Sequence, residues 1–480
     1  MSTTRRDFLL RSAAVAGLGF LPRARAASST PESTDVVVIG AGLSGLQAAW
    51  DLQQAGCKVL VLEARDRVGG KVFTFSNVQG TPEAGGNIIY GDYRRIIDVA
   101  ARLGITLDDQ VTRLARHVSY TLVLDGKPVS RKDWPDSPRN PFPAGLREMM
   151  PWQYVPLVMS QENPLQNLDD WYGPGNARYD IPMHDFLRAQ GATEDVIRLA
   201  YDTIPTYGTN SKDISALMMA CVSAFTSRQK SVKPVMYQAA GGNQLIPEAM
   251  ASKLQQGVRF NEAVRSIESE REGVQVRTTS GNRYSARAVV CALPFATLRQ
   301  IDIHPSLSGE QARAVRTLPH QQIHQTALQV SAPFWEIDGL EPSMWTDSPI
   351  GRVAAIYHGH EVDNVSSLVV SAFGPGAAYL DRLGGAGAAR YVVAQLEQMR
   401  PAAQGKLAVT AQHSWTKDPF SGGGWAYFNP GTVTRFLPAM FQPHGRIHFC
   451  GEQTSVTARG MEGALESGER AAKEVIDQLG

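Results

Sequence analysis

The stretch 35–71 combines two apolar, β-branched runs with a glycine-rich loop, and this order constrains the fold more than any other part of the chain. Residues Asp35–Ile39 read DVVVI, which is typical of a strand buried on both faces of a parallel sheet. Gly40, Gly42 and Gly45 follow as G-x-G-x-x-G at the start of a helical pattern. In such a loop the first glycine turns the chain, the second lets the backbone approach a pyrophosphate, and the third lets helix and strand pack closely. The loop therefore predicts a dinucleotide site with its phosphates at the helix N-terminus.

A second strand and an acidic residue complete the dinucleotide pattern. The run Lys58–Leu62 is mostly apolar, and Glu63 follows it, about 20 residues after the glycine loop. A carboxylate at this place accepts hydrogen bonds from ribose hydroxyls and disfavours a 2′-phosphate, which argues against NADP. At this point the sequence leaves NAD and FAD open.

Residues 1–26 are predicted to be a twin-arginine export signal. The pair Arg5–Arg6 precedes an apolar run, 12–21, and then the small-residue site Ala24–Ala26. The apolar run is too short to span a bilayer, and no later segment reaches about 18 uninterrupted apolar residues, so no stable membrane insertion is expected. The mature protein is therefore expected in the periplasm or outside the cell.

Length and charge narrow the function classes further. At 480 residues the chain is too long for one core, so two domains are expected. The formal net charge is +1, and removal of residues 1–26, which hold five arginines and one aspartate, changes it to about −3. No basic excess is left to predict nucleic-acid binding. The four cysteines are scattered without metal-binding spacing, so no metal site is predicted and they are interpreted as small buried apolar residues: Cys57, Cys221, Cys291 and Cys450.

A different domain begins after Arg94, where the alternation of strands and helices stops and a stretch rich in Pro and Trp follows. Later helical patterns predict a mostly helical cover. The helices expected there are Met183–Gln190, Thr193–Tyr201 and Asp213–Phe225. Strands and helices alternate again towards the C-terminus, because turn signals separate short apolar runs. The strands expected are Val258–Phe260, Ala263–Ile267, Val274–Thr278, Ala288–Ala292 and Ile447–Cys450, with helices at Asn243–Leu254 and Gly463–Leu479.

Three separated blocks together resemble the flavin-containing amine oxidase family, which includes monoamine and polyamine oxidases and borders on the L-amino-acid oxidases. The blocks are 40–45 with 63–71 and 83–86; 241–242 with Val264 and 292–294; and 449–452 with 460–464 and 467–472. The resemblance implies FAD as the cofactor and an α/β fold, in which a discontinuous Rossmann-like FAD-binding domain lies beside a second, α+β substrate-binding domain. On this basis we assign 34–92, 236–300 and 440–480 to the FAD-binding domain, and 93–235 and 301–439 to the substrate-binding domain.

The resemblance assigns the cofactor contacts mostly to strand ends and glycine turns. By resemblance, the cofactor-binding residues are Gly40, Gly42, Gly45, Glu63, Arg65, Gly70, Lys71, Gly86, Val264, Gly451, Glu452 and Met461. The family usually has Arg where this chain has Lys71, which keeps the charge but loses the planar fork that binds phosphate bidentately. Glu452 is expected to accept from ribose or ribitol hydroxyls. Met461 precedes a helix whose N-terminal amides and dipole can stabilise the negative charge of a reduced flavin.

On the substrate side, two tryptophans match aromatic positions of the family. Trp415 corresponds to an aromatic residue near the flavin and Trp425 to one that faces the substrate amine, where such rings exclude water and guide the amine. Gly424 stands where monoamine oxidases bind flavin covalently through a cysteine, so noncovalent FAD is expected. Gly460 stands where those enzymes place a second cage tyrosine, so the cage is incomplete unless another ring fills it. The candidates are Tyr90, Tyr207, Tyr237 and Tyr357.

Two further positions are candidates for the site. Many relatives hold a lysine near flavin N5, on the strand that leads into 333–335, and that place is taken here by His324 or Gln325. Loss of the lysine would change how a water is held and slow the reaction of reduced flavin with oxygen. Asn87 is a candidate for lining the site, although an asparagine in a turn is an equally good interpretation.

The predicted reaction is the oxidative deamination of an amine, in which hydride passes from the amine-bearing carbon to flavin N5 and the imine is hydrolysed. The electrons would then reach oxygen, giving peroxide, or a periplasmic carrier such as a cytochrome. An L-amino-acid oxidase is the first alternative, and it needs a cation for the substrate carboxylate, for which Arg94, Arg95 and Arg459 are candidates. A flavin-binding assembly or interaction protein without turnover is the second alternative. A homodimer is left open.

Overall fold

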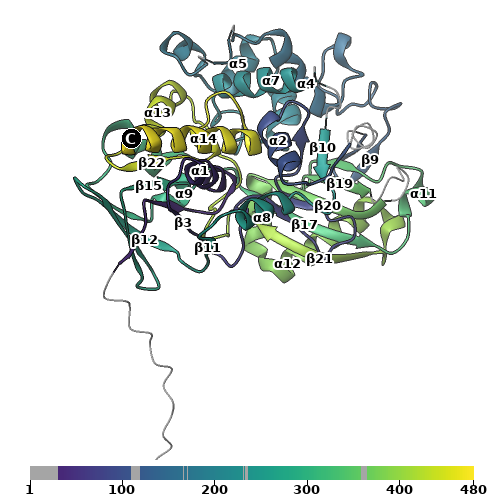
Figure 1. Ribbon diagram of the computed structural model, residues 1–480. Coiled ribbons are helices and arrows are strands. Elements are labelled where there is room, and N and C mark those ends of the chain that lie inside the picture. The colour runs from purple at the N-terminus through teal and green to yellow at the C-terminus, as the bar shows by residue number, and fades with distance from the viewer. Residues whose placement is uncertain are drawn as a thin grey trace, which may run out of the picture.

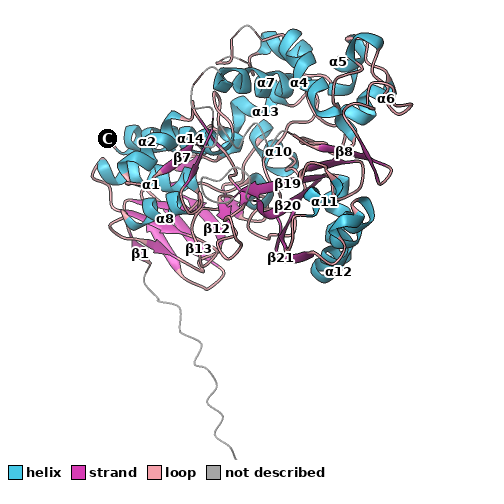
Figure 2. Ribbon diagram, turned by 90° about the vertical axis from the view of Figure 1, so that its right-hand side faces the viewer, coloured by secondary structure: helices cyan, strands magenta, loops and turns pink. Residues whose placement is uncertain are grey.

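The computed structural model describes residues 31–109, 119–165, 167–169, 171–230, 232, 236–357 and 365–480. The export signal, residues 1–26, lies outside the described residues and stays a prediction. Figure 1 shows two sheet-containing regions side by side with a group of helices above them, and the same separation is visible after the turn by 90° in Figure 2.

A five-stranded parallel sheet forms the centre of the first region. Its strands, in spatial order, are β11 (Val258–Arg259), β3 (Val59–Leu62), β2 (Val36–Ile39), β15 (Ala288–Cys291) and β22 (Ile447–Phe449). Every neighbouring pair is parallel, and the VVVI and VLVL runs of β2 and β3 are buried along their whole length, as a sheet covered on both faces requires. The strands predicted for this sheet are confirmed within one residue at each end.

Two helices pack against each other on this sheet: α1 (Leu43–Gln54) and α14 (Gly460–Leu479), purple and yellow in Figure 1. The chain turns away after α1 at Gly56, which has φ +90°, a conformation suited to glycine at a helix end. A third helix, α8 (Leu245–Ser252), contacts α1. Because α14 begins at Gly460 rather than at the predicted Gly463, Met461 lies in its first turn.

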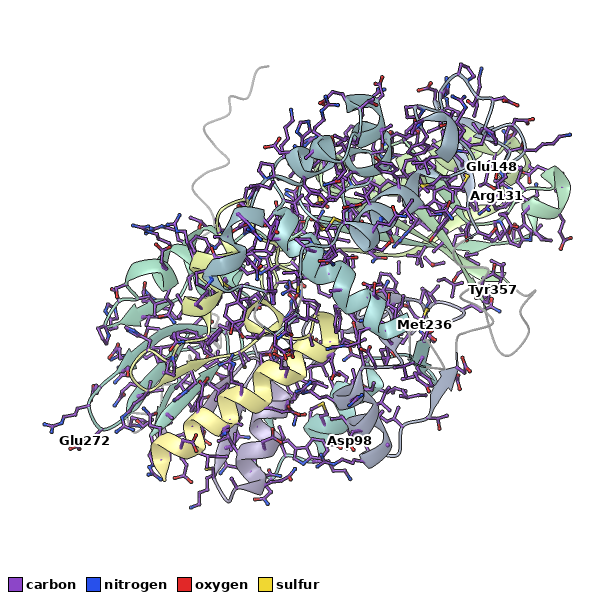
Figure 3. The ribbon with its side chains drawn as sticks, turned by 90° about the horizontal axis from the view of Figure 1, so that it is seen from above. Asp98, Arg131, Glu148, Met236, Glu272 and Tyr357 are labelled. Carbon is purple, nitrogen blue, oxygen red and sulfur yellow. The ribbon has the colours of Figure 1, made fainter. Side chains whose placement is uncertain are left out.

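A second sheet extends the first region. Its order is β1 (Glu32–Ser33), β14 (Arg283–Ala286), β13 (Val274–Thr278), β12 (Val264–Ser269) and β16 (Asp302–His304). Because β16 pairs with β12, this region extends slightly past residue 300, where the assigned FAD-binding segment ends. Two smaller sheets follow the glycine turns: β4 (Phe73–Thr74) with β5 (Glu83–Gly85), and β6 (Ile89–Tyr90) with β10 (Met236–Ala239) and β7 (Leu107–Asp109). Met236, labelled in Figure 3, marks the start of β10.

A seven-stranded mixed sheet forms the second region. Its order is β21 (Leu407–Ser414), β17 (Ile323–Val330), β20 (Val365–Phe373), β19 (Arg352–Tyr357), β18 (Met344–Thr346), β8 (Thr121–Leu124) and β9 (Lys127–Val129). The long helix α12 (Pro375–Met399) packs on β17, β20 and β21. All of these strands come from the segments 93–235 and 301–439.

A group of helices lies above the two sheets in Figure 1: α4 (Pro151–Gln161), α5 (Met183–Ala189) and α7 (Ala216–Lys230). Further helices are α2 (Arg94–Arg102), which contacts α14, α6 (Glu194–Ile197), α9 (Phe295–Leu298), α10 (Gly309–Thr317), α11 (Phe334–Asp338) and α13 (Val433–Met440). The helix predicted over 193–201 is instead the short α6 followed by a π-helical turn, Arg198–Asp202. Among the described residues, no helix is both long and apolar enough to cross a bilayer.

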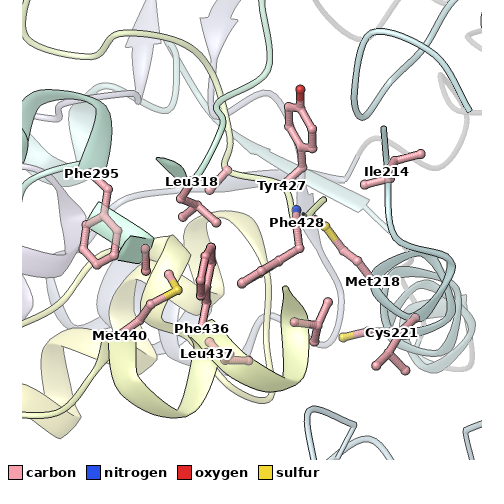
Figure 4. Close-up of a cluster of buried hydrophobic side chains, with 14 of the residues drawn as sticks. Ile214, Met218, Cys221, Phe295, Leu318, Tyr427, Phe428, Phe436, Leu437 and Met440 are labelled. Atoms are coloured by element: carbon pink, nitrogen blue, oxygen red, sulfur yellow. Dashed lines mark hydrogen bonds between the residues drawn. The ribbon is translucent and has the colours of Figure 1, made fainter. Parts of the chain in front are cut away.

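A core cluster joins α7 and α13 around Phe428, three residues after Trp425. Figure 4 shows Met218 and Cys221 of α7 near Phe428, with side chains of α13 on its other side. All four cysteines are free; Cys57 is half-buried and the others are buried, in line with their interpretation as small apolar residues.

Candidate active site

The glycine loop after β2 has a conformation that excludes side chains. Gly40 has φ +101°, and a Cβ on Gly45 would lie 2.0 Å from the Gly40 carbonyl oxygen. Gly42 faces a second glycine turn, because a Cβ on Gly70 would lie 3.2 Å from the Gly42 Cα. Two bare stretches of backbone therefore meet at the N-terminus of α1, where a diphosphate can approach the amides without steric conflict. This cradle fits the pyrophosphate of FAD.

Glu63 lies buried at the carboxyl end of β3, beside the glycine loop. Its two carboxylate oxygens accept hydrogen bonds from the Ala41 amide at 2.8 Å and from the Arg65 amide at 2.9 Å. These bonds hold the carboxylate where a ribose would lie. The Glu262 amide donates to the Glu63 carbonyl at 2.9 Å, so the strand that begins at Val264 starts beside the same edge of the sheet.

Arg65 connects the cofactor side to a loop of the second region. Its Nη2 donates to Asp418 at 2.6 Å and to Ser421 at 2.8 Å, and its guanidinium lies 5.4 Å from the centre of the Phe420 ring. The side chain therefore fixes the loop that leads to Trp425. A contact between Arg65 and FAD stays a prediction.

Lys71 makes a second connection to the same loop. Its ammonium group donates to the Gly424 carbonyl, next to Trp425. Burial lowers the pKa of Lys71 to about 8, while the nearby Glu452 carboxylate acts in the opposite direction. The structure thus directs Lys71 to the backbone of the substrate loop, and its contact with the diphosphate stays a prediction.

The glycine pair 85–86 brings residues from the two regions into contact. A Cβ on Gly85 would lie 2.7 Å from the Trp415 ring, and the Trp415 indole donates to the Ala84 carbonyl at 2.8 Å. Gly86 has φ +72°, and a Cβ there would lie 3.2 Å from the Met461 sulfur. The predicted site residues Gly86, Trp415 and Met461 therefore meet around this turn.

The turn after β22 places another carboxylate near the N-terminus of α14. Gly451 has φ +129°, and its amide donates to the Ser467 hydroxyl at 2.9 Å. The Glu452 carboxylate forms an ion pair with Arg459, with 2.8 Å between Oε1 and Nη2. Glu452 is therefore held by a cation that the sequence left unassigned.

Trp425 packs in a group of three aromatic rings. Its ring centre lies 5.7 Å from that of Tyr207, at an angle of 53° between the planes, and 6.1 Å from that of Phe373. The Trp425 indole also donates to the Thr206 carbonyl at 3.1 Å, which ties the loop of Tyr207 to Trp425. Among the described residues, Tyr207 is the candidate tyrosine whose ring contacts that of Trp425.

The position that lacks the cage tyrosine has a different neighbour. Gly460 has φ +61°, and a Cβ on it would lie 3.3 Å from the Tyr93 hydroxyl oxygen. Tyr93 stacks on Phe225 and contacts Tyr90 edge-on. The buried Tyr357 belongs to the core of the seven-stranded sheet. The sequence could not select Tyr207, because it lies in a loop whose contact with Trp425 arises only from tertiary packing.

The structure separates the two candidates for the lysine position. His324 points to α12, where its Nδ1 lies 2.8 Å from the Asp381 carboxylate. Gln325 points to the opposite face of β17, the face that packs with Trp415, and its Oε1 accepts from the Ser371 hydroxyl at 3.4 Å. His324 therefore points away from the candidate site, and Gln325 points towards it.

His413 is a site neighbour that the sequence analysis missed. It pairs with Gln325 across β21 and β17, and its ring centre lies 4.2 Å from that of Trp415. Its Nε2 lies 3.5 Å from the Asp418 carboxylate. Burial lowers the pKa of His413 to about 4, so the ring is neutral at pH 7. Strand register was needed to find it, because two antiparallel strands far apart in sequence bring the side chains together.

Asn87 lies in the loop between β5 and β6 and is exposed. The neighbouring Gly86 carbonyl accepts a hydrogen bond of 2.6 Å from the Asn243 amide group, so the turn is fixed independently of Asn87. A role for Asn87 in the site stays a prediction.

Among the described residues, no group of three or more His, Cys, Asp or Glu side chains is arranged to hold a metal ion.

Comparison with known proteins decides the family. The family model described as "Flavin containing amine oxidoreductase" matches residues 43–476. The chain belongs to this family. Human amine oxidase [flavin-containing] B is 27% identical in an alignment of 490 positions that covers 93% of this chain and 86% of that protein.

Two solved structures of amine oxidases share the fold of this family member. Cyclohexylamine oxidase from Brevibacterium oxydans IH-35A has a TM-score of 0.75 at 23% identity, covering 93% of this chain and 99% of the other. Wild-type putrescine oxidase bound to putrescine has a TM-score of 0.73 at 22% identity, covering 93% and 100%. The predicted α/β fold is confirmed.

The flavin-containing amine oxidoreductase family also establishes the chemistry. The chain is an FAD-dependent oxidoreductase that deaminates amines oxidatively, so the predicted cofactor, enzyme class and reaction are confirmed. The residues around the glycine cradle and Glu63 fit FAD, as described above.

Proposed function

We propose that the amine is oxidised beside the aromatic pair formed by Trp425 and Tyr207, and that this pair replaces the family's two-ring cage. The observation that carries the proposal is the 5.7 Å contact between the two rings, together with the hydrogen bond that ties Trp425 to Thr206. Rings in this arrangement exclude water and favour a neutral or cationic amine over their faces. Tyr207 thus takes over the role for which Gly460 offers no side chain.

FAD supplies the redox chemistry when bound, because its flavin accepts a hydride from the carbon that bears the amine, and the resulting imine is then hydrolysed by water. The protein contributes orientation and exclusion of water. Trp425 holds the amine at one side of the site, while Trp415 is fixed by its hydrogen bond to Ala84 next to the glycine pair. We infer noncovalent FAD, since Gly424 carries no nucleophile.

The N-terminus of α14 supplies favourable electrostatics for a reduced cofactor. This helix runs for 20 residues from Gly460, and its first-turn amides are free of intrahelical partners. A helix N-terminus carries about half a positive charge, which stabilises negative charge nearby. Met461, in the first turn, lies beside the glycine pair, since a Cβ on Gly86 would be 3.2 Å from its sulfur, so we propose that these amides face the flavin.

We infer that the electrons leave to oxygen or to a periplasmic carrier, and that the carrier is the better acceptor. The support is Gln325, which lies on the strand face towards the site, where many relatives hold a lysine. A neutral amide stabilises negative charge on oxygen less than an ammonium group does. The export signal predicted at residues 1–26 would bring the mature enzyme to the compartment of such carriers.

The position of the arginines bears on the amino-acid oxidase alternative. Arg94 is exposed, and Arg95 forms ion pairs with Glu462 at 3.2 Å and Glu469 at 2.7 Å, so neither is directed at a substrate. Residues 87–91 place no arginine directly after the glycine pair. Arg459 alone of the three candidates is buried near the proposed site.

The test is anaerobic reduction of the purified yellow holoenzyme. Panels of primary amines, secondary amines and L-amino acids are added, and loss of the flavin absorbance band is followed. We expect bleaching by an amine, and subsequent addition of oxygen or cytochrome c in separate cuvettes identifies the faster acceptor. Bleaching by no compound of either class would favour a flavin-binding protein without turnover. Acid precipitation of the same sample should release all the flavin if it is noncovalent.

A further inference from the structure

Arg459 is a buried cation with few partners. It directly precedes Gly460 at the start of α14, and only 6% of its surface is exposed. Its one ion pair among the described residues joins Nη2 to Glu452 at 2.8 Å, and its Nε and Nη1 have no hydrogen-bond partner there. A guanidinium group has five N–H donors, and leaving them unsatisfied in a buried place is costly. These donors therefore indicate a missing acceptor.

The carboxylates around Arg459 are already engaged elsewhere. Glu466 accepts hydrogen bonds from two backbone amides and two hydroxyl groups of residues 455–457. Glu462 accepts from the amides of α2 and pairs with Arg95. Only Glu452 remains, and its charge also acts on the buried Lys71. Glu452 thus faces two buried cations, Arg459 and Lys71, while Asp418, the other carboxylate that acts on Lys71, pairs with Arg65, so the local balance favours an additional anion.

The surroundings of Arg459 belong to the substrate side. Burial raises the pKa values of Tyr207 and Cys221, in the case of Cys221 to about 12. The positive charge of Arg459 acts on both groups in the opposite direction. Cys221 lies on α7 of the second region, as Figure 4 shows, and Tyr207 is the ring partner of Trp425. Arg459 is therefore held at the N-terminus of α14, within electrostatic reach of Tyr207 on the substrate side.

We propose that Arg459 binds a carboxylate group of the substrate, so that the enzyme's substrate is an amino carboxylate rather than a simple amine. This inference rests on the proposed function, in which the amine is placed beside Trp425 and Tyr207. The planar fork of arginine matches the two oxygens of a carboxylate, and such charge-assisted pairs are strong when water is excluded. The carboxylate can belong to an α-amino acid or to a longer ω-amino acid, and both share the chemistry that Arg459 recognises.

The competing role for Arg459 is to stabilise negative charge on the reduced flavin. A cation serving that role would raise the flavin reduction potential and act equally on all substrates. A cation that binds the substrate carboxylate would instead discriminate between matched compounds with and without this group. The two roles therefore differ in substrate dependence.

The experiment compares matched pairs of compounds in wild-type holoenzyme, Arg459→Met and Arg459→Lys. One pair is phenylalanine and phenethylamine, which differ by the α-carboxylate; the other is 5-aminopentanoate and butylamine. Anaerobic stopped-flow reduction gives the apparent Kd and limiting rate for each compound. Independently of turnover, benzoate is titrated into the oxidised holoenzyme and the shift of the flavin absorbance is recorded. Arg94→Met serves as the matched control, because Arg94 is exposed.

We expect wild-type enzyme to bind the carboxylate member of at least one pair more tightly and to bind benzoate. Arg459→Met should weaken both by about 10- to 100-fold, the loss of a hydrogen-bonded charge pair, while Arg459→Lys restores part of the affinity and Arg94→Met changes neither. Preference for the α- or the ω-amino acid identifies the position of the carboxylate. If Arg459→Met fails to fold, the wild-type comparison and the benzoate titration still decide.

Equal or weaker binding of both carboxylate compounds by wild-type enzyme would overturn the inference and leave amine oxidation intact. So would unchanged discrimination in Arg459→Met combined with a lowered flavin potential, which would assign Arg459 to the cofactor. If no amine and no amino acid reduces the flavin, the proposed function itself is wrong. The two failures are therefore distinguishable.

Discussion

The cofactor side and the substrate side of this enzyme are built in different ways. On the cofactor side, the predicted binding positions are glycines and a carboxylate at the ends of neighbouring parallel strands, and a Cβ on Gly45 would collide with backbone. On the substrate side, Trp425, Tyr207 and Gln325 come from two loops and a strand of another sheet. A glycine whose conformation excludes a Cβ cannot be replaced, whereas side chains from different elements can line the same pocket. The cofactor is therefore specified locally and the substrate by long-range packing.

On the cofactor side, the change expected to damage FAD binding most is Gly45→Ala. Its Cβ would lie 2.0 Å from the Gly40 carbonyl oxygen, so the loop must open and lose its fit to the diphosphate. We expect the flavin-to-protein absorbance ratio of purified protein to fall at least about tenfold, since such overlap costs more than about 1.4 kcal/mol. Gly145→Ala is the control, because a Cβ there meets nothing within 4 Å. Wild-type FAD content in Gly45→Ala would contradict the claim that backbone geometry specifies the cofactor side.

Tyr207→Leu tests whether the second ring of the substrate side comes from this loop. Leucine keeps apolar contact with Trp425 but removes the aromatic face, so we expect the efficiency of flavin reduction by the best amine to fall about tenfold, with FAD content unchanged. Tyr379→Leu is the control, because Tyr379 pairs with Tyr391 on α12, away from Trp425. Wild-type reduction kinetics in Tyr207→Leu would exclude Tyr207 from the cage.

Gln325→Lys tests the choice of electron acceptor. An ammonium group on this face of β17 would stabilise negative charge that develops on oxygen, so we expect the reduced enzyme to react with oxygen about tenfold faster. The rate is measured by mixing photoreduced enzyme with aerated buffer. Gln329→Lys, on the same strand but exposed, should leave the rate unchanged. An unaltered oxygen rate in Gln325→Lys would show that Gln325 does not control the acceptor.

A pH dependence of folding stability is expected on the cofactor side, at Glu83. This carboxyl is buried beside the glycine pair, and burial raises its pKa from 4.5 to about 7, although the Asn243 amide and the Thr74 hydroxyl donate to it. The folded protein therefore holds a proton that the unfolded chain releases. The stabilising contribution is complete below pH 4.5 and is lost as pH rises to about 7.

Glu83→Gln should remove this pH dependence. Urea unfolding at pH 5 and pH 8 should show wild-type stability falling more steeply than that of the variant, by on the order of 2 kcal/mol. Glu162→Gln, an exposed substitution, should follow the wild type. Parallel curves for wild type and Glu83→Gln would contradict the assignment.

Local patterns explain why the cofactor side could be predicted from the sequence. The strands β2 and β3, the glycine loop and Glu63 are encoded within 35–63 by apolar runs and turn residues whose effects reach only a few positions. The helix expected over 193–201 is confirmed only in its first turn, because residues 198–202 form a π-helical turn. The division into domains stays a prediction.

The substrate side needed strand register and loop contacts. His324 and Gln325 are adjacent in sequence but point to opposite faces of β17, so a one-residue change of register exchanges their roles. His413 became a neighbour of Trp415 only through the pairing of β21 with β17. The substrate-side residues come singly from separate elements, so they form no spacing pattern that can be recognised in the sequence.

The most direct test of the central claim is to measure FAD content and anaerobic flavin reduction in one preparation of Trp425→Ala. The account predicts that FAD remains bound at the wild-type ratio, while reduction by the best amine slows about 100-fold, because the ring that orients the amine is gone. Trp335→Ala, on α11 and packed against Phe334, is the matched control. Reduction at the wild-type rate, or loss of FAD together with activity, would contradict the separation of the two sides.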